Sequence, residues 1–224
     1  MAAKGKQHPA WYRHFFYRKE SWRTTWKLRL LLFVLVLVAV VGGRHFWERQ
    51  IGESLVCDQQ TPHSDALLLE NFDTDYLIFE RAEFLKRTGI APRVFIPASA
   101  YDNGELSSVE KGTVELFARI AGLREYEKIP IRLTEPISLN AANQIREVLA
   151  KENIQSLIVI SPGFRSRRSA LVYRTVFNPI GIRVSCDPVF GSVNPRNWTD
   201  TWHGIQDVLE AFIKLQYYRF WVLQ

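Results

Sequence analysis

The chain has 224 residues, of which 47% are hydrophobic and 23% are charged, and its formal net charge is +6. This length and apolar content suit one well-packed core rather than two. The first 29 positions hold eight basic residues and one acidic residue, whereas the remainder has a net charge of −1. The basic charge therefore belongs to a tail, and the composition disfavours nucleic acid as a partner of the folded part.

A long apolar segment follows the basic tail. From Leu28 to Val41 only Arg29 interrupts it, and two glycines end it. With its flanks, from 26 to 47, it would span roughly 33 Å as a helix, enough for a hydrocarbon core of about 30 Å. We predict a transmembrane signal anchor over 28–47, with membrane lipid as its partner. A cleaved signal peptide and a buried core helix are the alternatives.

The charge distribution predicts the orientation. The positive-inside rule keeps the basic, aromatic tail 1–27 in the cytoplasm and exports a stalk at 48–63 and a domain at 64–224. The expected location is the inner membrane, crossed once, with the domain in the periplasm. The tail either lies on the inner leaflet or is a disordered segment that only sets the topology.

Beyond the stalk, short apolar runs alternate with longer amphipathic segments. Strands are predicted at 65–69, 93–96, 131–133, 157–160 and 182–185, and helices at 73–88, 107–122, 138–152, 165–177 and 201–218. Alternation with fully apolar strands predicts a mostly parallel sheet covered by helices on both faces. The expected fold class is therefore α/β, a Rossmann-like doubly wound domain.

Two of the predicted helices carry additional patterns. Ser107 and Glu110 have the spacing of a capping box. In the last helix, the apolar residues predicted to face the core are Ile205, Val208, Leu209, Phe212 and Leu215. The aromatic segment 217–221 either closes the core or forms a surface for the membrane or a partner.

Polar residues follow four of the predicted strands, where ligands bind in sheets of this kind. The candidate ligand-binding residues are Glu70, Asn71, Ser99, Glu135, Asn140, Asn143, Ser161, Arg165 and Arg167. The first strand runs into Glu70 and Asn71 instead of a glycine-rich phosphate loop, which disfavours a nicotinamide or flavin enzyme. The five histidines are scattered. We therefore predict neither a metal site nor a cofactor.

Three arginines stand at the start of the helix after the fourth strand. The helix dipole disfavours cations there, so an anionic ligand or a nearby carboxylate is expected to accompany them. Arg167 and Arg168 cannot both face the same way, and we predict that Arg167 points inward, toward Glu135, and Arg168 outward. The alternative is a solvated face with diffuse ion pairs.

The two cysteines, Cys57 and Cys186, both fall on the side predicted to be exported, where a disulfide persists. Cys57 precedes the first predicted strand and Cys186 ends the last one. The sequence is compatible with a bridge between them and with two free buried thiols.

Two spaced motifs stand out in the region 65–190, Ile131-x-Leu133-x-Glu135-x-x-Ser138 and Val159-Ile160-Ser161-Pro162-x-x-x-x-Arg167. With them the region resembles the SanA/ElyC/YdcF family, bacterial proteins of which several are membrane-anchored and linked to envelope integrity. Further matches are Asp65-Ala66, Ala82-x-x-Leu85-x-x-x-Gly89-x-Ala91-Pro92 and Glu110.

The chain also departs from that family. Glu70-Asn71 and Pro97-Ala98-Ser99 replace its glycine-rich turns, and Asn140-Ala141-Ala142-Asn143 stands near its Thr-x-Glu-Asn-Ala segment. Phe164 stands where the family has a histidine, and phenylalanine cannot transfer a proton. The resemblance thus implies a pocket kept in outline, with changed or lost chemistry.

Two functions follow as expectations. In the first, an anchored, exported domain binds an anionic envelope metabolite, such as a phosphate-bearing glycan or glycolipid, with or without transferase or hydrolase activity. In the second, a non-catalytic adaptor of envelope or polysaccharide assembly keeps the fold, has a degenerate site and binds a protein partner. Arginine and glutamate side chains at the strand ends favour the first, and the missing histidine and glycines favour the second.

Overall fold

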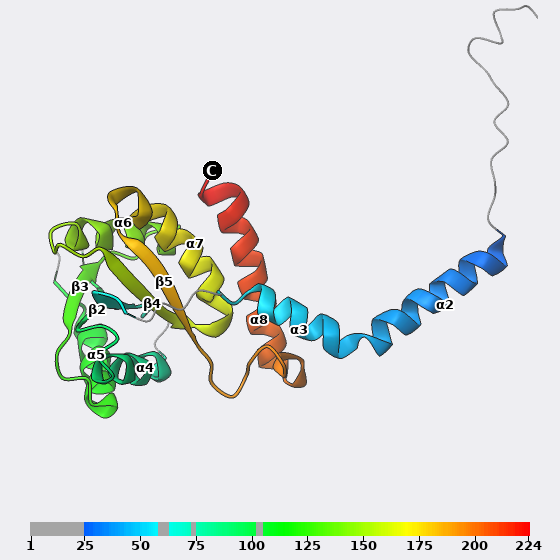
Figure 1. Cartoon of the computed structure of the whole chain (residues 1–224), viewed down its shortest axis with the longest axis horizontal. Helices are drawn as coiled ribbons and strands as arrows, with labels where there is room; N and C mark the ends of the chain where they lie inside the picture. The colour runs from blue at the N-terminus through cyan, green and yellow to red at the C-terminus, as the bar shows by residue number, and fades with distance from the viewer. Residues whose placement is uncertain (1–24, 58–62, 73–74, 102–104) are drawn as a thin grey trace, which may run out of the picture. The chain divides into compact units, whose positions relative to one another are not determined.

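The computed structural model describes residues 25–57, 63–72, 75–101 and 105–224 (Figure 1). Most of the predicted cytoplasmic tail lies outside these residues. The chain divides after Arg44 into two units, each of which is considered by itself. In the first unit, helix α2 (Trp26–Gly42) has no buried residue.

The predicted anchor 28–47 is not one continuous helix. Helix α2 ends at Gly42, and helix α3 (Arg44–Ser54) begins after Gly43. No single helix among the described residues is long and apolar enough to cross a membrane; α2 and α3 meet those criteria only as an interrupted pair, by length and composition alone.

The second unit contains a five-stranded, entirely parallel sheet with the strand order β3-β2-β1-β4-β5. The strands are β1 (Ala66–Leu69), β2 (Arg93–Ser99), β3 (Glu127–Ile131), β4 (Ser156–Pro162) and β5 (Arg183–Val189). This confirms the predicted α/β, Rossmann-like class. The third strand was misplaced by the prediction, because β3 ends at Ile131, where the predicted strand 131–133 begins.

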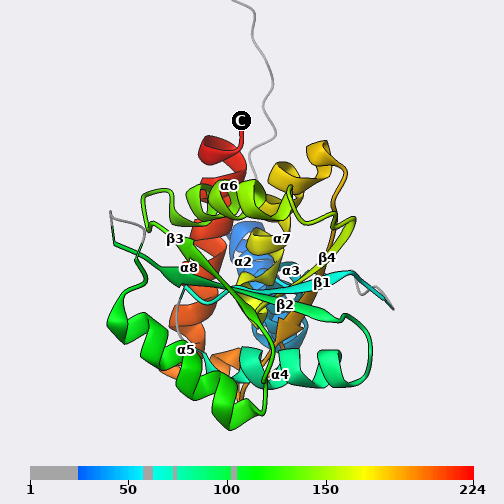
Figure 2. The same ribbon diagram turned by 90° about the vertical axis from the view of Figure 1, so that its left-hand side faces the viewer.

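Helices cover both faces of the sheet. They are α4 (Tyr76–Arg87), α5 (Ser108–Ala121), α6 (Ile137–Leu149) and α7 (Ser166–Phe177). A further helix, α8 (Trp202–Tyr217), packs on α7 instead of on the sheet. Figure 2 shows α4 and α5 on one side of the sheet and α6 on the other. Alternate residues of the strands divide accordingly. Leu67 and Leu69 pack with α4 and α5, whereas Ala66 and Leu68 pack with α6 and α7.

Three 3₁₀ turns and one π-helical turn complete the described secondary structure. They are η1 (Gly163–Arg165), η2 (Asn178–Ile180), η3 (Trp198–Asp200) and the π-helical η4 (Tyr218–Val222). The turn η1 separates β4 from α7, so α7 begins one residue later than predicted.

Asp65 ties the start of β1 to the start of β4. One oxygen of its carboxylate accepts hydrogen bonds from the backbone N–H groups of Gln155 and Ser156 and from the Ser156 hydroxyl, at 2.8–2.9 Å. The backbone bond from Gln155 and the hydroxyl bond from Ser156 are the main causes that lower the pKa of Asp65. These hydrogen bonds align the starts of β1 and β4, and they thereby set the register of the two strands at their carboxyl ends.

Part of the predicted stalk belongs to the folded domain. Leu55, after α3, packs with Trp198, Val208, Ala211 and Leu215 in a satellite core. The indole Nε1 of Trp198 donates a hydrogen bond to the backbone oxygen of Glu48 at 2.8 Å. The compact unit therefore begins at His45 rather than at residue 64.

Two predicted helix features are wrong. Ser107 makes no side-chain capping bond, and Glu110 instead accepts a hydrogen bond from Asn71, so there is no capping box. In α8, Leu209 and Phe212 are exposed, because the helix turns a different face, containing Gly204 and Ala211, toward the satellite core.

The close approach of α8 to η3 yields a stability prediction. A Cβ atom at Gly204 would lie 2.3 Å from the backbone oxygen of Trp198. We expect Gly204→Ala to lower the free energy of unfolding by about 1–3 kcal/mol, because a backbone atom cannot move aside as a side-chain tip does. Chemical denaturation of the full chain in detergent measures the change.

The matched control is Gly112→Ala in α5, where an added Cβ would meet no atom within 4 Å. Alanine has the higher helix propensity, so this variant should gain up to about 1 kcal/mol. Equal stabilities of the two variants would contradict the tight packing of α8 on η3.

Candidate functional site

The strand order reverses between β1 and β4, and the polar residues at their carboxyl ends are buried there. The backbone N–H of Glu70 donates to the oxygen of Ile160 at 2.9 Å, which continues the ladder one step beyond the pair Leu69 and Ile160. Glu70, Asn71 and Ser161 are all buried. This is the topological switch point at which open α/β sheets bind ligands.

Glu70 and Asn71 turn to opposite faces of the sheet. The Ser169 hydroxyl, on α7, donates a hydrogen bond to Oε2 of Glu70. The side-chain amide of Asn71 donates to Oε1 of Glu110 at 3.0 Å, toward α5. Burial raises the pKa of the Glu110 carboxyl above its ordinary value. Only Glu70 therefore contributes to the α7 side of the switch point.

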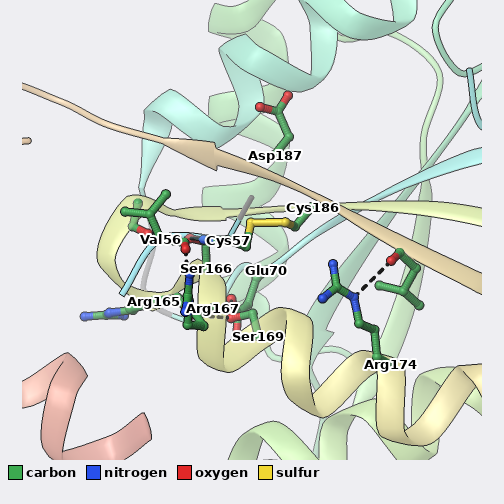
Figure 3. Close-up of a disulfide and its surroundings, with 12 residues drawn as sticks. Val56, Cys57, Glu70, Arg165, Ser166, Arg167, Ser169, Arg174, Cys186 and Asp187 are labelled. Carbon is green, nitrogen blue, oxygen red and sulfur yellow. Dashed lines mark hydrogen bonds between the residues drawn. A yellow bond between two sulfur atoms is a disulfide. The ribbon is translucent and has the colours of Figure 1, made fainter. Parts of the chain in front are cut away.

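A short segment, residues 55–57, contacts the beginning of α7, and we call it the strap. The backbone N–H of Arg167 donates a hydrogen bond to the backbone oxygen of Leu55 at 3.1 Å. The side-chain Nε of Arg167 donates another to the backbone oxygen of Val56 at 3.0 Å. The N–H of Cys57 donates to the Ser166 hydroxyl at 3.1 Å. Figure 3 shows Arg167 directed at the strap and Ser169 directed at Glu70.

The strap is covalently fixed to the sheet. Cys57 and Cys186 form a disulfide with a Cα–Cα distance of 6.4 Å, which is the bridged alternative of the two that the sequence left open (Figure 3). Cys186 lies on β5, so the bridge joins the strap to the strand beside β4.

The predicted roles of Arg167 and Arg168 are reversed. Arg167 is exposed and bound to the strap, whereas only 8% of Arg168 is exposed. Arg168 is four residues from the buried Val172 and therefore shares its helical face. Its guanidinium carbon lies 5.6 Å from the centroid of the Tyr218 ring, in the range of a cation–π contact. The strap contacts fix this rotation of α7.

A cleft with two lobes opens at the carboxyl ends of the strands. The first, which we call the aromatic lobe, has a volume of about 220 Å³ and is lined by Glu70, Phe72, Leu133, Glu135, Ile137, Ser138, Pro162, Arg165, Arg168, Lys214, Tyr217 and Tyr218. It holds three basic side chains and two carboxylates, which gives a net positive lining.

The second, which we call the acidic lobe after its three carboxylate side chains, has a volume of about 330 Å³. It shares Pro162, Arg165, Arg168 and Lys214 with the aromatic lobe. Asp75, Asp207 and Glu210 balance the three shared basic side chains there. The cations thus stand between a lobe of net positive charge and a lobe that is neutral overall.

Several buried polar atoms near Glu70 lack hydrogen-bond partners within the described part of the chain. They are Nε of Arg168, the hydroxyl of Tyr173 and the hydroxyl of Ser161. Burial, and then the charge of Glu70, raise the pKa of Tyr173 well above its ordinary value, so its hydroxyl stays protonated. Buried donors without a protein partner are rare and point to water or a ligand.

The other predicted site residues divide into two groups. Glu135 lines the aromatic lobe, and the Asn140 amide donates to the backbone oxygens of Thr134 and Glu135, at 3.1 and 2.9 Å, which holds the loop. Ser99, at the end of β2, and Asn143, on α6, line neither lobe. Of the nine predicted site residues, the structure therefore brings Glu70, Glu135 and Arg165 together in the cleft lining, and the other six line neither lobe.

Sequence reasoning missed the contribution of the last helix. Lys214 lines both lobes, and the Tyr218 hydroxyl accepts a hydrogen bond from the backbone N–H of Ser138 at 3.1 Å. The three charged residues Asp207, Glu210 and Lys214 recur at helical spacing, which was a usable signal. Within the described ranges, no group of three or more histidine, cysteine, aspartate or glutamate residues is placed to hold a metal ion.

Comparison with known proteins yields no match to a family model and no match to a curated protein. The family resemblance therefore stays a hypothesis, and the geometry of the cleft carries the functional interpretation.

Proposed function

We propose that this chain binds an anionic ligand, bearing phosphate or carboxylate, in the two-lobed cleft. The observation that carries the proposal is Arg168, a nine-tenths buried arginine that lines both lobes and whose Nε has no hydrogen-bond partner in the described part of the chain. A buried guanidinium with an unmet donor is costly, and an anionic ligand would supply the acceptor.

The surroundings of Arg168 support an anion over a neutral ligand. Arg165 and Lys214 lie on the same shared wall of the cleft. The carboxylates Glu70 and Glu135 suit hydroxyl groups attached to the anion, and Tyr217 and Phe72 offer aromatic surface for a ring. A phosphorylated or carboxylated sugar combines these features.

We further propose that the chain is anchored in the bacterial inner membrane through α2, with the second unit in the periplasm. Helix α2 is 17 residues long, about 25 Å at 1.5 Å per residue, and exposes apolar side chains along its whole length. The aromatic Trp26, Phe46 and Trp47 flank this span, as residues at membrane interfaces do. The disulfide supports an oxidising compartment. The proposed setting is envelope or surface-polysaccharide biogenesis, as the family resemblance suggests.

A second function, a non-catalytic adaptor in an envelope assembly, is favoured by one observation. Phe164, at the position of the family histidine, is packed in the satellite core, and its ring makes an edge contact with Phe190 at 5.5 Å between centroids. Position 164 also lines the acidic lobe, but a phenylalanine side chain cannot exchange protons with a ligand there.

Thermal unfolding of the full chain in nanodiscs separates the two functions. Glucose 1-phosphate, inorganic phosphate and glucuronate are the anionic probes, and glucose is the neutral control. A probe at 100 times its dissociation constant should stabilise the fold by about 2.7 kcal/mol, which raises the midpoint. Stabilisation by at least one anion and none by glucose is expected. No shift with any anion, or an equal shift with glucose, would contradict the anion site and leave the adaptor.

A further inference from the structure

Helix α8 presents three faces with different surroundings. One face is buried in the satellite core and consists of Gly204, Val208, Ala211 and Leu215. A second lines the acidic lobe and consists of Asp207, Glu210 and Lys214. These three are the only Asp, Glu, Lys or Arg residues of the helix. The third face therefore has no formal charge.

This third face is apolar and exposed. Trp202, Leu209 and Ile213 recur at intervals of seven and four residues, which places them on one side of the helix. Their exposed fractions are 71%, 53% and 65%. We call these residues, with the neighbouring exposed Phe212 and Tyr217 and with Phe220 and Trp221 of η4, the α8 stripe. Within α8 its polar neighbours are Gln206 and Gln216, which carry no charge, and in η4 the guanidinium carbon of Arg219 lies 5.8 Å from the centroid of the Phe220 ring.

An exposed stripe of this length is unusual for a protein surface. The solvent side of a helix normally carries charged residues, and contiguous apolar patches mark sites of interaction with proteins or membranes. The stripe extends over the whole of α8, about 24 Å at 1.5 Å per residue, and continues into η4.

The position of the stripe in the chain points to a lipid surface as the occupant. Trp198, four residues before α8, donates its indole hydrogen bond to the backbone of Glu48. Glu48 is six residues beyond Gly42, the last residue of α2, a span of at most about 22 Å even for fully extended chain. If α2 lies in a bilayer, as proposed above, the beginning of α8 cannot be far from the surface of that bilayer.

The composition of the stripe agrees with an interfacial helix. Tryptophan stands at its beginning, Trp202, and at its end, Trp221, and tryptophan and tyrosine prefer the boundary between lipid and water. Exposed Phe46 and Trp47 on α3 add aromatic surface next to the exit of the anchor. An apolar face of this kind lies in the headgroup region with its axis parallel to the membrane.

We infer that the α8 stripe rests on the surface of the membrane that holds α2. This inference depends on the proposed anchoring, and it assigns the second unit a fixed face toward the bilayer. The charged face of α8 is adjacent to the stripe and lines the acidic lobe. With the stripe on the membrane, the acidic lobe would lie beside the lipid headgroups.

Photo-cross-linking of the full chain in phosphatidylcholine nanodiscs tests the inference. The photoreactive residue p-benzoylphenylalanine replaces Leu209 or, in a second variant, Ile213. It replaces Leu35 in α2 as a probe of anchoring, and Leu116, an exposed residue on α5, as the control. We expect lipid adducts at positions 35, 209 and 213, with at least tenfold less adduct at 116, measured by mass spectrometry.

The outcomes separate this inference from the proposal on which it rests. Adducts at 35 without adducts at 209 and 213 would overturn the inference and leave the anchor intact. Failure at all three positions would refute the anchor itself. A cross-link from 209 or 213 to a second copy of the chain would also overturn the inference, because a protein would then cover the stripe.

Discussion

Arg168→Ala is expected to weaken the binding of glucose 1-phosphate by about 30- to 150-fold. Loss of a charge-assisted hydrogen bond in a buried site costs about 2–3 kcal/mol, and each 1.4 kcal/mol corresponds to a factor of ten. Arg168 is placed to make such a bond because it lines both lobes and is nearly excluded from water. Isothermal titration of the full chain in nanodiscs measures the affinity.

Arg167→Ala is the matched control, since it removes the same side chain one residue away. Arg167 is exposed and binds the strap, so the affinity should change less than threefold. Arg168→Lys keeps the charge but not the planar fork, and it should recover only part of the affinity. Equal losses in the two alanine variants, with unchanged unfolding midpoints, would show that Arg168 does not bind the anion.

Removal of the disulfide by Cys57→Ser with Cys186→Ser is expected to lower the free energy of unfolding by about 3 kcal/mol. The bridge closes a loop between residues that are 129 positions apart, and long loops lose much entropy in the unfolded chain when they are closed. For a domain of this size the unfolding midpoint should fall by about 6–12 °C. Circular dichroism during heating measures the midpoint.

Wild-type chain treated with dithiothreitol is the control, and it should unfold at the same temperature as the double variant. An unchanged midpoint in both samples would contradict a stabilising role of the bridge. Thiol trapping with an alkylating reagent in intact cells also tests the orientation. Free, alkylated Cys57 and Cys186 would place the second unit in a reducing compartment, against the proposed export.

The central strands of the sheet could be predicted from the sequence because they are apolar. The runs at β1 and β4 stand out against amphipathic neighbours, and both were predicted within two residues of their ends. Strand β3 was not, because it lies at the edge of the sheet and pairs only with β2. An edge strand tolerates polar residues and Pro130, so its sequence lacks a continuous apolar run.

The site was predictable only where it follows a strand. Glu70, Glu135 and Arg165 were identified because strand ends gather at one edge of a parallel sheet. The choice between Arg167 and Arg168 was wrong because the strap, more than 100 residues away in sequence, sets the rotation of α7. Lys214 and Tyr218 were missed for a related reason: the helical spacing of Asp207, Glu210 and Lys214 indicates a charged face on the last helix but does not show which strand ends that face will contact.

Tyr218 bears on the order in which the cleft forms. Its hydroxyl bonds to the backbone of Ser138, 80 residues earlier, and its ring lies against Arg168. The five strands precede this residue in the chain, so the sheet from β1 through β5 can form before the aromatic lobe has this wall. The aromatic lobe is therefore complete only after η4 has docked against α6 and α7.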